Sequence, residues 1–93
     1  MIIGTAIIKL STPWCHSLKE KRMVVKSLIN KIKHKFNISI AEVEAQDFHQ
    51  TIVLGIACVS NSTRHANSEI QNVVDFIENN TEANLENINV EIL

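Results

Sequence analysis

The sequence predicts an α+β domain in which two helices cover one face of a four-stranded antiparallel sheet. Two observations support this prediction. Apolar residues alternate, or run continuously with β-branched side chains, in four segments, and they recur at intervals of three and four residues in two others. The chain has 93 residues, of which 45% are hydrophobic. This length and apolar content suit a single domain spanning residues 1–93.

The first two elements are a strand and a helix. Residues 2–10 are rich in β-branched side chains and end at a Ser-Thr-Pro turn, which predicts a strand. Ser17 then begins a capping box that Glu20 completes. We expect the Ser17 hydroxyl to accept the Glu20 amide and the Glu20 carboxylate to reach back to the Ser17 amide. The helix ends at about residues 34–36, and its apolar residues fall within about 100° of arc, the stripe of a helix on a core: Leu18, Val25, Leu28, Ile29, Ile32 and Phe36.

The middle of the chain predicts a hairpin. Residues 37–46 alternate imperfectly, which indicates a strand at an edge of the sheet with Glu42 and Glu44 on one side and apolar residues on the other. A short connection leads to residues 50–59, a strand that is apolar on both faces. Because so few residues separate the two strands, we expect them to pair with each other.

The last third of the chain predicts a helix and a strand. The polar segment 60–62 can cap a helix that runs to about Asn79, and residues 85–93 alternate again as a fourth strand. The order βαββαβ has one common compact solution, the ferredoxin-like fold, with sheet order 4-1-3-2. The second helix repeats its apolar residues at Ala66, Ile70, Val73, Val74 and Ile77.

The sheet face away from the helices has an unusual composition. The first and third predicted strands are apolar on both sides, although a sheet with helices on one side alone should have a polar second face. We therefore expect a homo-oligomer that buries this face; the alternative is a modest exposed patch on a monomer. Neither strand contains an aromatic residue, which argues against RNA recognition by base stacking on the sheet.

Charge is distributed unevenly along the chain. Residues 1–35 carry eight basic residues against Glu20 alone, a net +7, and residues 36–93 carry −8, which together give the net charge of −1. Such asymmetry indicates a polyanionic partner. We predict a nucleic-acid or anion interface on the first helix, where His16 and Ser17 precede a stripe of Lys19, Arg22, Lys26 and Lys33. The alternative is that these lysines only keep the helix soluble.

The sequence gives little support to catalysis or metal binding. The predicted topology brings His16, Asp47 and His49 to one edge of the sheet with Cys15, but no CxxC, HxH or HxxxH pair is present. We expect no catalytic residue, no metal and no cofactor. We predict a cytoplasmic protein, because its two thiols are isolated and no signal peptide is present. We expect no membrane partner, because no apolar run approaches ~20 residues.

The segment His16-Ser17-Leu18-Lys19-Glu20-Lys21-Arg22 resembles the YlxP-like family of small uncharacterised bacterial proteins. The likeness covers essentially the whole chain, through residues 36–43, 46–47, 53–55 and 90–93. The resemblance implies a ferredoxin-like fold but no settled activity and no catalytic residues. The family's genes often lie among those for transcription elongation and translation initiation, near a ribosome-binding factor, which implies an RNA setting. Where the family has small residues before its histidine, this chain has Trp14-Cys15, so a loop function that needs a small, mobile tip does not carry over.

These observations favour a non-enzymatic accessory protein whose basic helix contacts RNA phosphates, with a ribosomal precursor as one such RNA. The alternative is a homo-oligomeric protein-interaction module that uses the apolar sheet face and has no nucleic-acid role. A third interpretation, a hydrolase, requires the side chains of His16, Asp47 and His49 to converge.

Overall fold

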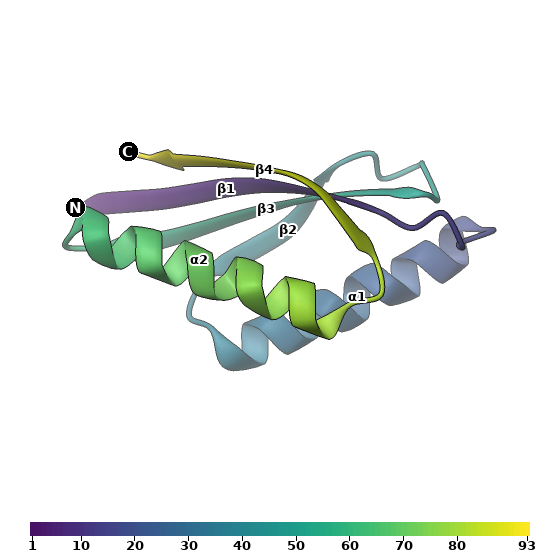
Figure 1. Ribbon diagram of the computed structural model, residues 1–93, viewed down its shortest axis with the longest axis horizontal. Helices are drawn as coiled ribbons and strands as arrows, with labels where there is room; N and C mark the ends of the chain where they lie inside the picture. The colour runs from purple at the N-terminus through teal and green to yellow at the C-terminus, as the bar shows by residue number, and fades with distance from the viewer.

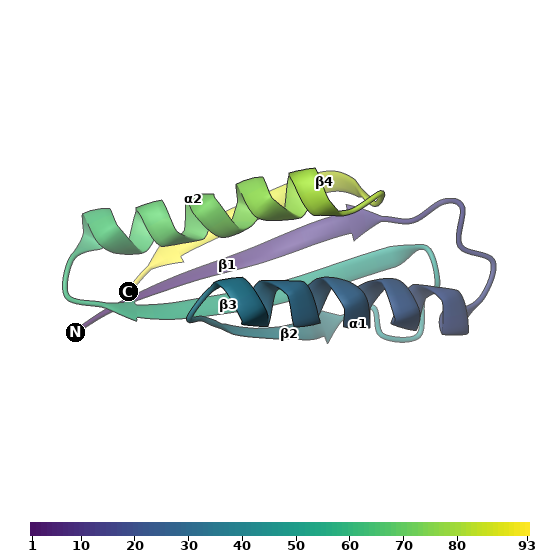
Figure 2. The same ribbon diagram turned by 90° about the horizontal axis from the view of Figure 1, so that it is seen from below.

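The computed structural model describes all 93 residues, and it confirms the predicted ferredoxin-like arrangement. The strands form one antiparallel sheet in the order β2-β3-β1-β4, and both helices lie on the same side of it (Figure 1). Seen from that side, the two helices run roughly along the strands, and β1 is visible between them (Figure 2). Neither helix is long and apolar enough to cross a membrane. The six elements are β1 (Ile2–Ser11), α1 (Leu18–Lys35), β2 (Ser39–Glu44), β3 (Thr51–Ser60), α2 (Thr63–Asn80) and β4 (Asn84–Ile92).

Serine hydroxyls cap both helices. Ser17 Oγ accepts a hydrogen bond from the Glu20 amide at 3.2 Å, as predicted, and Ser62 Oγ accepts one from the His65 amide at 3.1 Å. The Glu20 carboxylate accepts the amide of His16 at 3.3 Å, one residue earlier than the capping box predicts. The carboxylate therefore still occupies a backbone donor at the positive end of α1.

The core lies between the helices and the inner face of the sheet, which is the face toward the helices. Alternate residues of β1 and β3 are buried there, including Ile8 and Leu54. Gly4 permits α2 to approach β1 closely, since a Cβ at this position would lie 2.9 Å from Ile70 Cδ1 and 3.1 Å from Ala66 Cβ. Single glycines in these strands therefore serve close packing.

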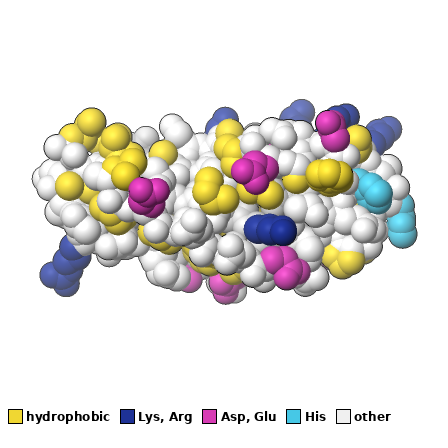
Figure 3. Space-filling model, turned by 90° about the horizontal axis from the view of Figure 1, so that it is seen from above, with side chains coloured by type: hydrophobic (Ala, Val, Ile, Leu, Met, Phe, Trp, Pro, Cys, Tyr) yellow, Lys and Arg dark blue, Asp and Glu magenta, His cyan; other side chains and the backbone are white.

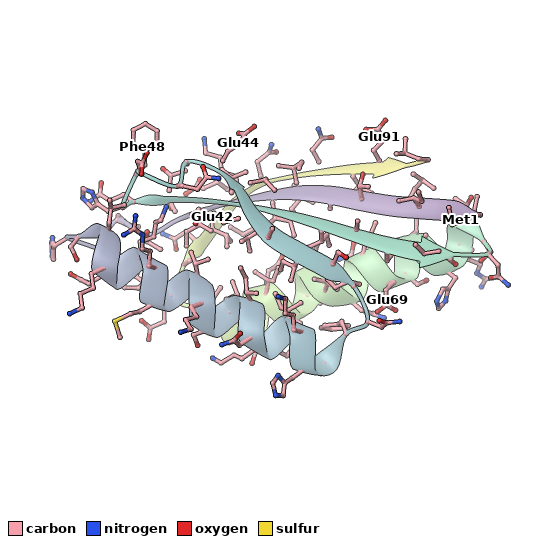
Figure 4. All side chains as sticks on the ribbon, turned by 180° about the vertical axis from the view of Figure 1, so that it is seen from behind. Met1, Glu42, Glu44, Phe48, Glu69 and Glu91 are labelled. Carbon is pink, nitrogen blue, oxygen red and sulfur yellow. The ribbon has the colours of Figure 1, made fainter.

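A β-bulge in β2 changes which side chains face the core. Glu42 pairs with Leu54, but Glu44 pairs with the very next residue of β3, Val53, so Val43 is an extra residue. One extra residue reverses the alternation, because side chains in a strand have a period of two. The prediction that Glu42 and Glu44 share a side is therefore wrong: Glu42 lies on the helix side and Glu44 on the opposite side (Figure 4).

No element of the protein covers the outer face of the sheet, the face away from the helices (Figures 1 and 4). Seen from this side, hydrophobic side chains gather at the end of the sheet near the chain termini and are scattered elsewhere among a few charged ones (Figure 3). Five of the large hydrophobic residues that are exposed belong to this face or its rim. They are Ile7, Val43, Phe48, Val59 and Leu93.

Candidate functional site

The predicted basic stripe lies on the solvent side of α1. The residues of α1 that face the sheet are buried, whereas all four stripe residues are exposed. The first and last of them lie 14 positions apart, which corresponds to about 21 Å along the helix axis. The protein contains one ion pair, between Lys21 and Glu42, so no acidic side chain pairs with any residue of the stripe. The stripe, Lys19, Arg22, Lys26 and Lys33, therefore presents four uncompensated charges to solvent.

The start of α1 is less available to an external anion than the sequence suggested. His16 and Ser17 are both exposed beside the stripe. However, the Glu20 carboxylate accepts the His16 amide, and the Ser17 hydroxyl accepts the Glu20 amide. Two of the backbone donors at this end are thus taken by the chain itself, and a negative charge already sits there. The amides of Leu18 and Lys19 have no hydrogen-bond partner within the chain, so these two donors and the side chains of Lys19 and His16 are what this end offers to a phosphate.

Lys21 has a different role from the other basic residues of α1. Its side chain is 0% exposed, and its Nζ atom lies 2.8 Å from Glu42 Oε2. The ammonium group also donates to three main-chain carbonyls of the β2–β3 connection: Ala45 at 2.7 Å, Thr51 at 3.2 Å and Gln46 at 3.3 Å. Ala45 has a left-handed backbone with φ of 59°. A single ammonium group therefore links the first turn of α1 to β2 and to the turn that follows it.

The burial of Lys21 corrects the charge assignment made from the sequence. It belongs to the eight basic residues of segment 1–35, but its charge is neutralised by Glu42, so about +6 of the +7 remains for an outside partner. The burial of Lys21 could have been predicted from its position in the helical repeat. At 3.6 residues per turn Lys21 lies about 60° from Leu18, inside the apolar stripe and between Leu28 and Ile32.

At the edge of the sheet near His16, the loops are joined by hydrogen bonds from the side chains of Thr12 and Gln50 to main-chain carbonyls. No titratable side chain takes part in these bonds. Thr12 Oγ1 donates to the carbonyl of His49 at 3.1 Å, and the Gln50 side-chain amide donates to the carbonyl of Cys15 at 3.3 Å. Cys15 is fully buried, while Asp47 and His16 are exposed. Nowhere do three or more His, Cys, Asp or Glu side chains converge in a way that could hold a metal ion. The topology brings these segments together, and no hydrogen bond or ion pair joins the side chains of His16, Asp47 and His49.

A groove of about 570 Å³ lies on the flank of α1 that faces the end of α2. It is lined by α1, by the last two residues of α2, by the α2–β4 connection and by Trp14, whose exposed fraction is 39%. Lys31 and Glu82 both line the groove, so its charge favours neither an anion nor a cation. The sequence contains no signal for this groove, because it depends on how far apart the two helices lie.

The sequence of this chain matches one family of proteins and one individual relative. Over residues 3–90 the chain matches the family described as "Protein of unknown function (DUF503)". It is 45% identical over 62 residues to the "Uncharacterized protein YlxP" of Bacillus subtilis (strain 168), a match that covers 67% of each protein. This relative is the namesake of the family that the His16–Arg22 segment resembles.

The fold also has a solved counterpart. The solution NMR structure of a de novo designed protein with a ferredoxin fold superposes with a TM-score of 0.59, at 16% identity. The superposition covers 99% of this chain and 84% of the designed one. At this identity the likeness concerns the fold alone. Taken together, the match over residues 3–90 and the identity to YlxP show that this chain belongs to the DUF503 family of proteins of unknown function.

Proposed function

We propose that the protein binds RNA through the basic stripe of α1, as a non-enzymatic accessory protein of the cytoplasm that acts on ribosomal or other structured RNA. One observation supports this proposal most directly. Every basic residue of the stripe is exposed without a counter-ion, although the chain as a whole contains ten acidic residues. Most acidic residues belong to α2, β4 and the segments around them, so the charge of α1 is not balanced locally.

The stripe suits phosphate contacts better than base recognition. Its four cations lie along about 21 Å of one helix, and lysine and arginine side chains of this kind contact phosphates without reading the sequence. Binding should therefore release counter-ions. With four phosphate contacts, a plot of the logarithm of the binding constant against the logarithm of salt concentration should have a slope of about −3 for a single strand and about −4 for a duplex segment.

The outer face of the sheet is a poor alternative surface for RNA. Sheet-reading RNA modules stack bases on aromatic side chains of the two central strands. In this protein β1 and β3 contain no aromatic residue, and Phe48 reaches the outer face only from the β2–β3 connection. Its acidic side chains, Glu44 and Glu91, would also repel phosphates (Figure 4). We therefore assign the RNA contacts to α1.

A matched pair of charge reversals tests the proposal. The variant Lys19→Glu/Arg22→Glu alters the stripe, and Lys31→Glu/Arg64→Glu makes the same charge change on the far flank of α1 and on α2. Fluorescence anisotropy with a labelled structured RNA at low salt should show at least a tenfold loss of affinity for the first variant and at most a threefold loss for the second. Adding Lys26→Glu to the first variant should abolish binding.

Two outcomes would contradict the proposal. Equal losses in the two variants would show that only the net charge matters and that α1 has no defined interface. Absence of binding by the unmodified protein at low salt would remove the RNA role altogether, because counter-ion release is then at its most favourable.

A further inference from the structure

The outer face of the sheet fits a second copy of this chain. We infer that two copies pack these faces together about a two-fold axis that lies between the sheets and runs parallel to the strands. This inference does not depend on RNA binding, because α1 lies on the opposite side of the sheet and stays exposed in both copies (Figure 1).

An apolar cluster at one end of the outer face supports this pairing. Ile3 of β1 lies opposite Val59 of β3, and on its other side it exchanges two backbone hydrogen bonds with Leu93, at 3.0 and 2.8 Å. Val59 and Leu93 are 68% and 63% exposed. A two-fold axis parallel to the strands, between β1 and β3, keeps this end of one sheet over the same end of the other. Ile3 of each copy then packs on Val59 of its partner, and the cluster is buried against itself.

The same axis also brings apolar residues in the middle of the outer face together. Ile7 of β1 pairs with Gly55 of β3, and Val43 of β2 leans over that glycine, with its Cγ1 atom 2.9 Å from where a Cβ would lie. Ile7 and Val43 are exposed to 44% and 43%. The axis places Ile7 of one copy above Gly55 of the other, where it meets the partner's Val43. Two half-exposed aliphatic side chains per copy are thus covered.

The charges of the face are complementary under the same operation. Lys9 is the only lysine or arginine among the strand residues of the outer face, and it pairs with Val53, which in turn pairs with Glu44. Lys9 and Glu44 border the same depression of about 480 Å³, but they form no ion pair within one copy. The two-fold axis sets Lys9 above the partner's Val53, with the partner's Glu44 one strand away. Sheets pack about 10 Å apart, which extended Lys and Glu side chains can bridge.

A two-fold axis between the sheets that runs perpendicular to the strands fits the surface less well. It reverses the strand direction, so the cluster of Ile3 would face the opposite end of the sheet, where Ser11 pairs with Thr51 and Phe48 is the large exposed apolar side chain. It would also bring Lys9 near Glu91 of the partner instead of Glu44. The two axes therefore predict different ion pairs, which a charge exchange can distinguish.

The size of the face predicts a weak dimer. The strands have ten, six, ten and nine residues; at about 3.3 Å per residue and about 4.8 Å between strands they cover roughly 550 Å² per copy and roughly 1,100 Å² in total. This lies just below the range of stable protein–protein interfaces, about 1,200–2,000 Å². We expect dissociation on dilution through the micromolar range.

Sedimentation equilibrium over concentrations from low micromolar to millimolar tests the inference. Val59→Asp should raise the dissociation constant at least a hundredfold. The matched control is Val90→Asp, also an exposed valine in a strand, at 45%, but one that pairs with Ala6 on the inner face; it should change the constant by less than threefold. Circular dichroism verifies that each variant is folded.

The charge exchange then identifies the axis. Lys9→Glu and Glu44→Lys should each raise the dissociation constant at least tenfold, and the double variant should return to within threefold of the original. A monomer at millimolar concentration, or a dimer that Val59→Asp leaves intact, would overturn the inference. Restoration by Lys9→Glu/Glu91→Lys in place of Lys9→Glu/Glu44→Lys would overturn the proposed axis.

Discussion

Replacing Lys21 by methionine should lower the free energy of unfolding by about 3 kcal/mol. Methionine has nearly the same volume and is one atom shorter, so the change removes the charge without opening a large cavity. It leaves the Glu42 carboxylate, whose Oε2 atom has Lys21 as its only polar partner, without a counter-ion. Loss of one member of a buried ion pair typically costs about 3–5 kcal/mol. Because the Glu42 side chain is 16% exposed, water can reach it, and we expect the lower limit of that range.

This loss is large relative to the stability of a domain of this size. At about 0.05–0.15 kcal/mol per residue, 93 residues correspond to a total of about 5–14 kcal/mol. A loss of 3 kcal/mol should lower Tm by roughly 12–24 °C. Adding Glu42→Leu should recover part of the loss, because replacing a whole buried pair by apolar residues is often nearly neutral. Recovery should be incomplete, since the carbonyls of Ala45, Gln46 and Thr51 still lack the donor.

Urea unfolding followed by far-ultraviolet circular dichroism measures the effect. If the slope of the unfolding free energy against urea concentration is unchanged, the compactness of the folded and unfolded states is preserved. The control is Lys26→Met, the same substitution at an exposed position of the same helix, which should stay within about 0.5 kcal/mol. If Lys21→Met unfolded at the same urea concentration as Lys26→Met, the ammonium group would not be stabilising the β2–β3 connection, and the reasoning would be refuted.

Three further substitutions test the backbone and the packing by the same unfolding measurement. Ala45→Gly should stabilise by about 0.5–1 kcal/mol, since glycine adopts the left-handed φ of 59° without the steric cost that alanine bears; a loss of stability would contradict this. Gly4→Ala should destabilise by about 1–3 kcal/mol through its clash with buried Ile70, and by more than Gly55→Ala, where the contacting side chain is half-exposed and can turn away. Ser62→Ala should cost about 1 kcal/mol by removing the cap of α2, and an effect below 0.3 kcal/mol would indicate that water replaces the hydroxyl.

The sequence was sufficient for the fold because its local signals agreed with one another. The hydroxyl of Ser17 caps α1 as its spacing to Glu20 predicts, and the period of two identifies the strands. The bulge at Val43 was not predictable, because it depends on pairing with β3 and not on β2 alone. Glu42 faces inward by the regular alternation from Ile40, and the bulge turns Glu44 outward, so the partner of Lys21 could not be named from the sequence even though the position of Lys21 in the helical stripe could.

The candidate interface was predictable only in part. Charge and helical spacing identify the stripe of Lys19, Arg22, Lys26 and Lys33, and the structure leaves all four exposed. The occupation of the helix start by Glu20 and the groove beside Trp14 depend on side-chain geometry and on the distance between helices. Neither has a signature in residue spacing.

The ammonium group of Lys21 also sets the rotation of α1 about its own axis. Aliphatic side chains make contacts without a preferred direction, whereas the Lys21 ammonium group makes three hydrogen bonds to main-chain carbonyls and one ion pair with Glu42, and these directed contacts restrict the rotation of the helix. Successive residues point about 100° apart, so the direction in which Arg22 faces follows from the setting of its neighbour. The direction in which the exposed stripe residues point therefore depends on Lys21, which is buried and cannot contact an external ligand.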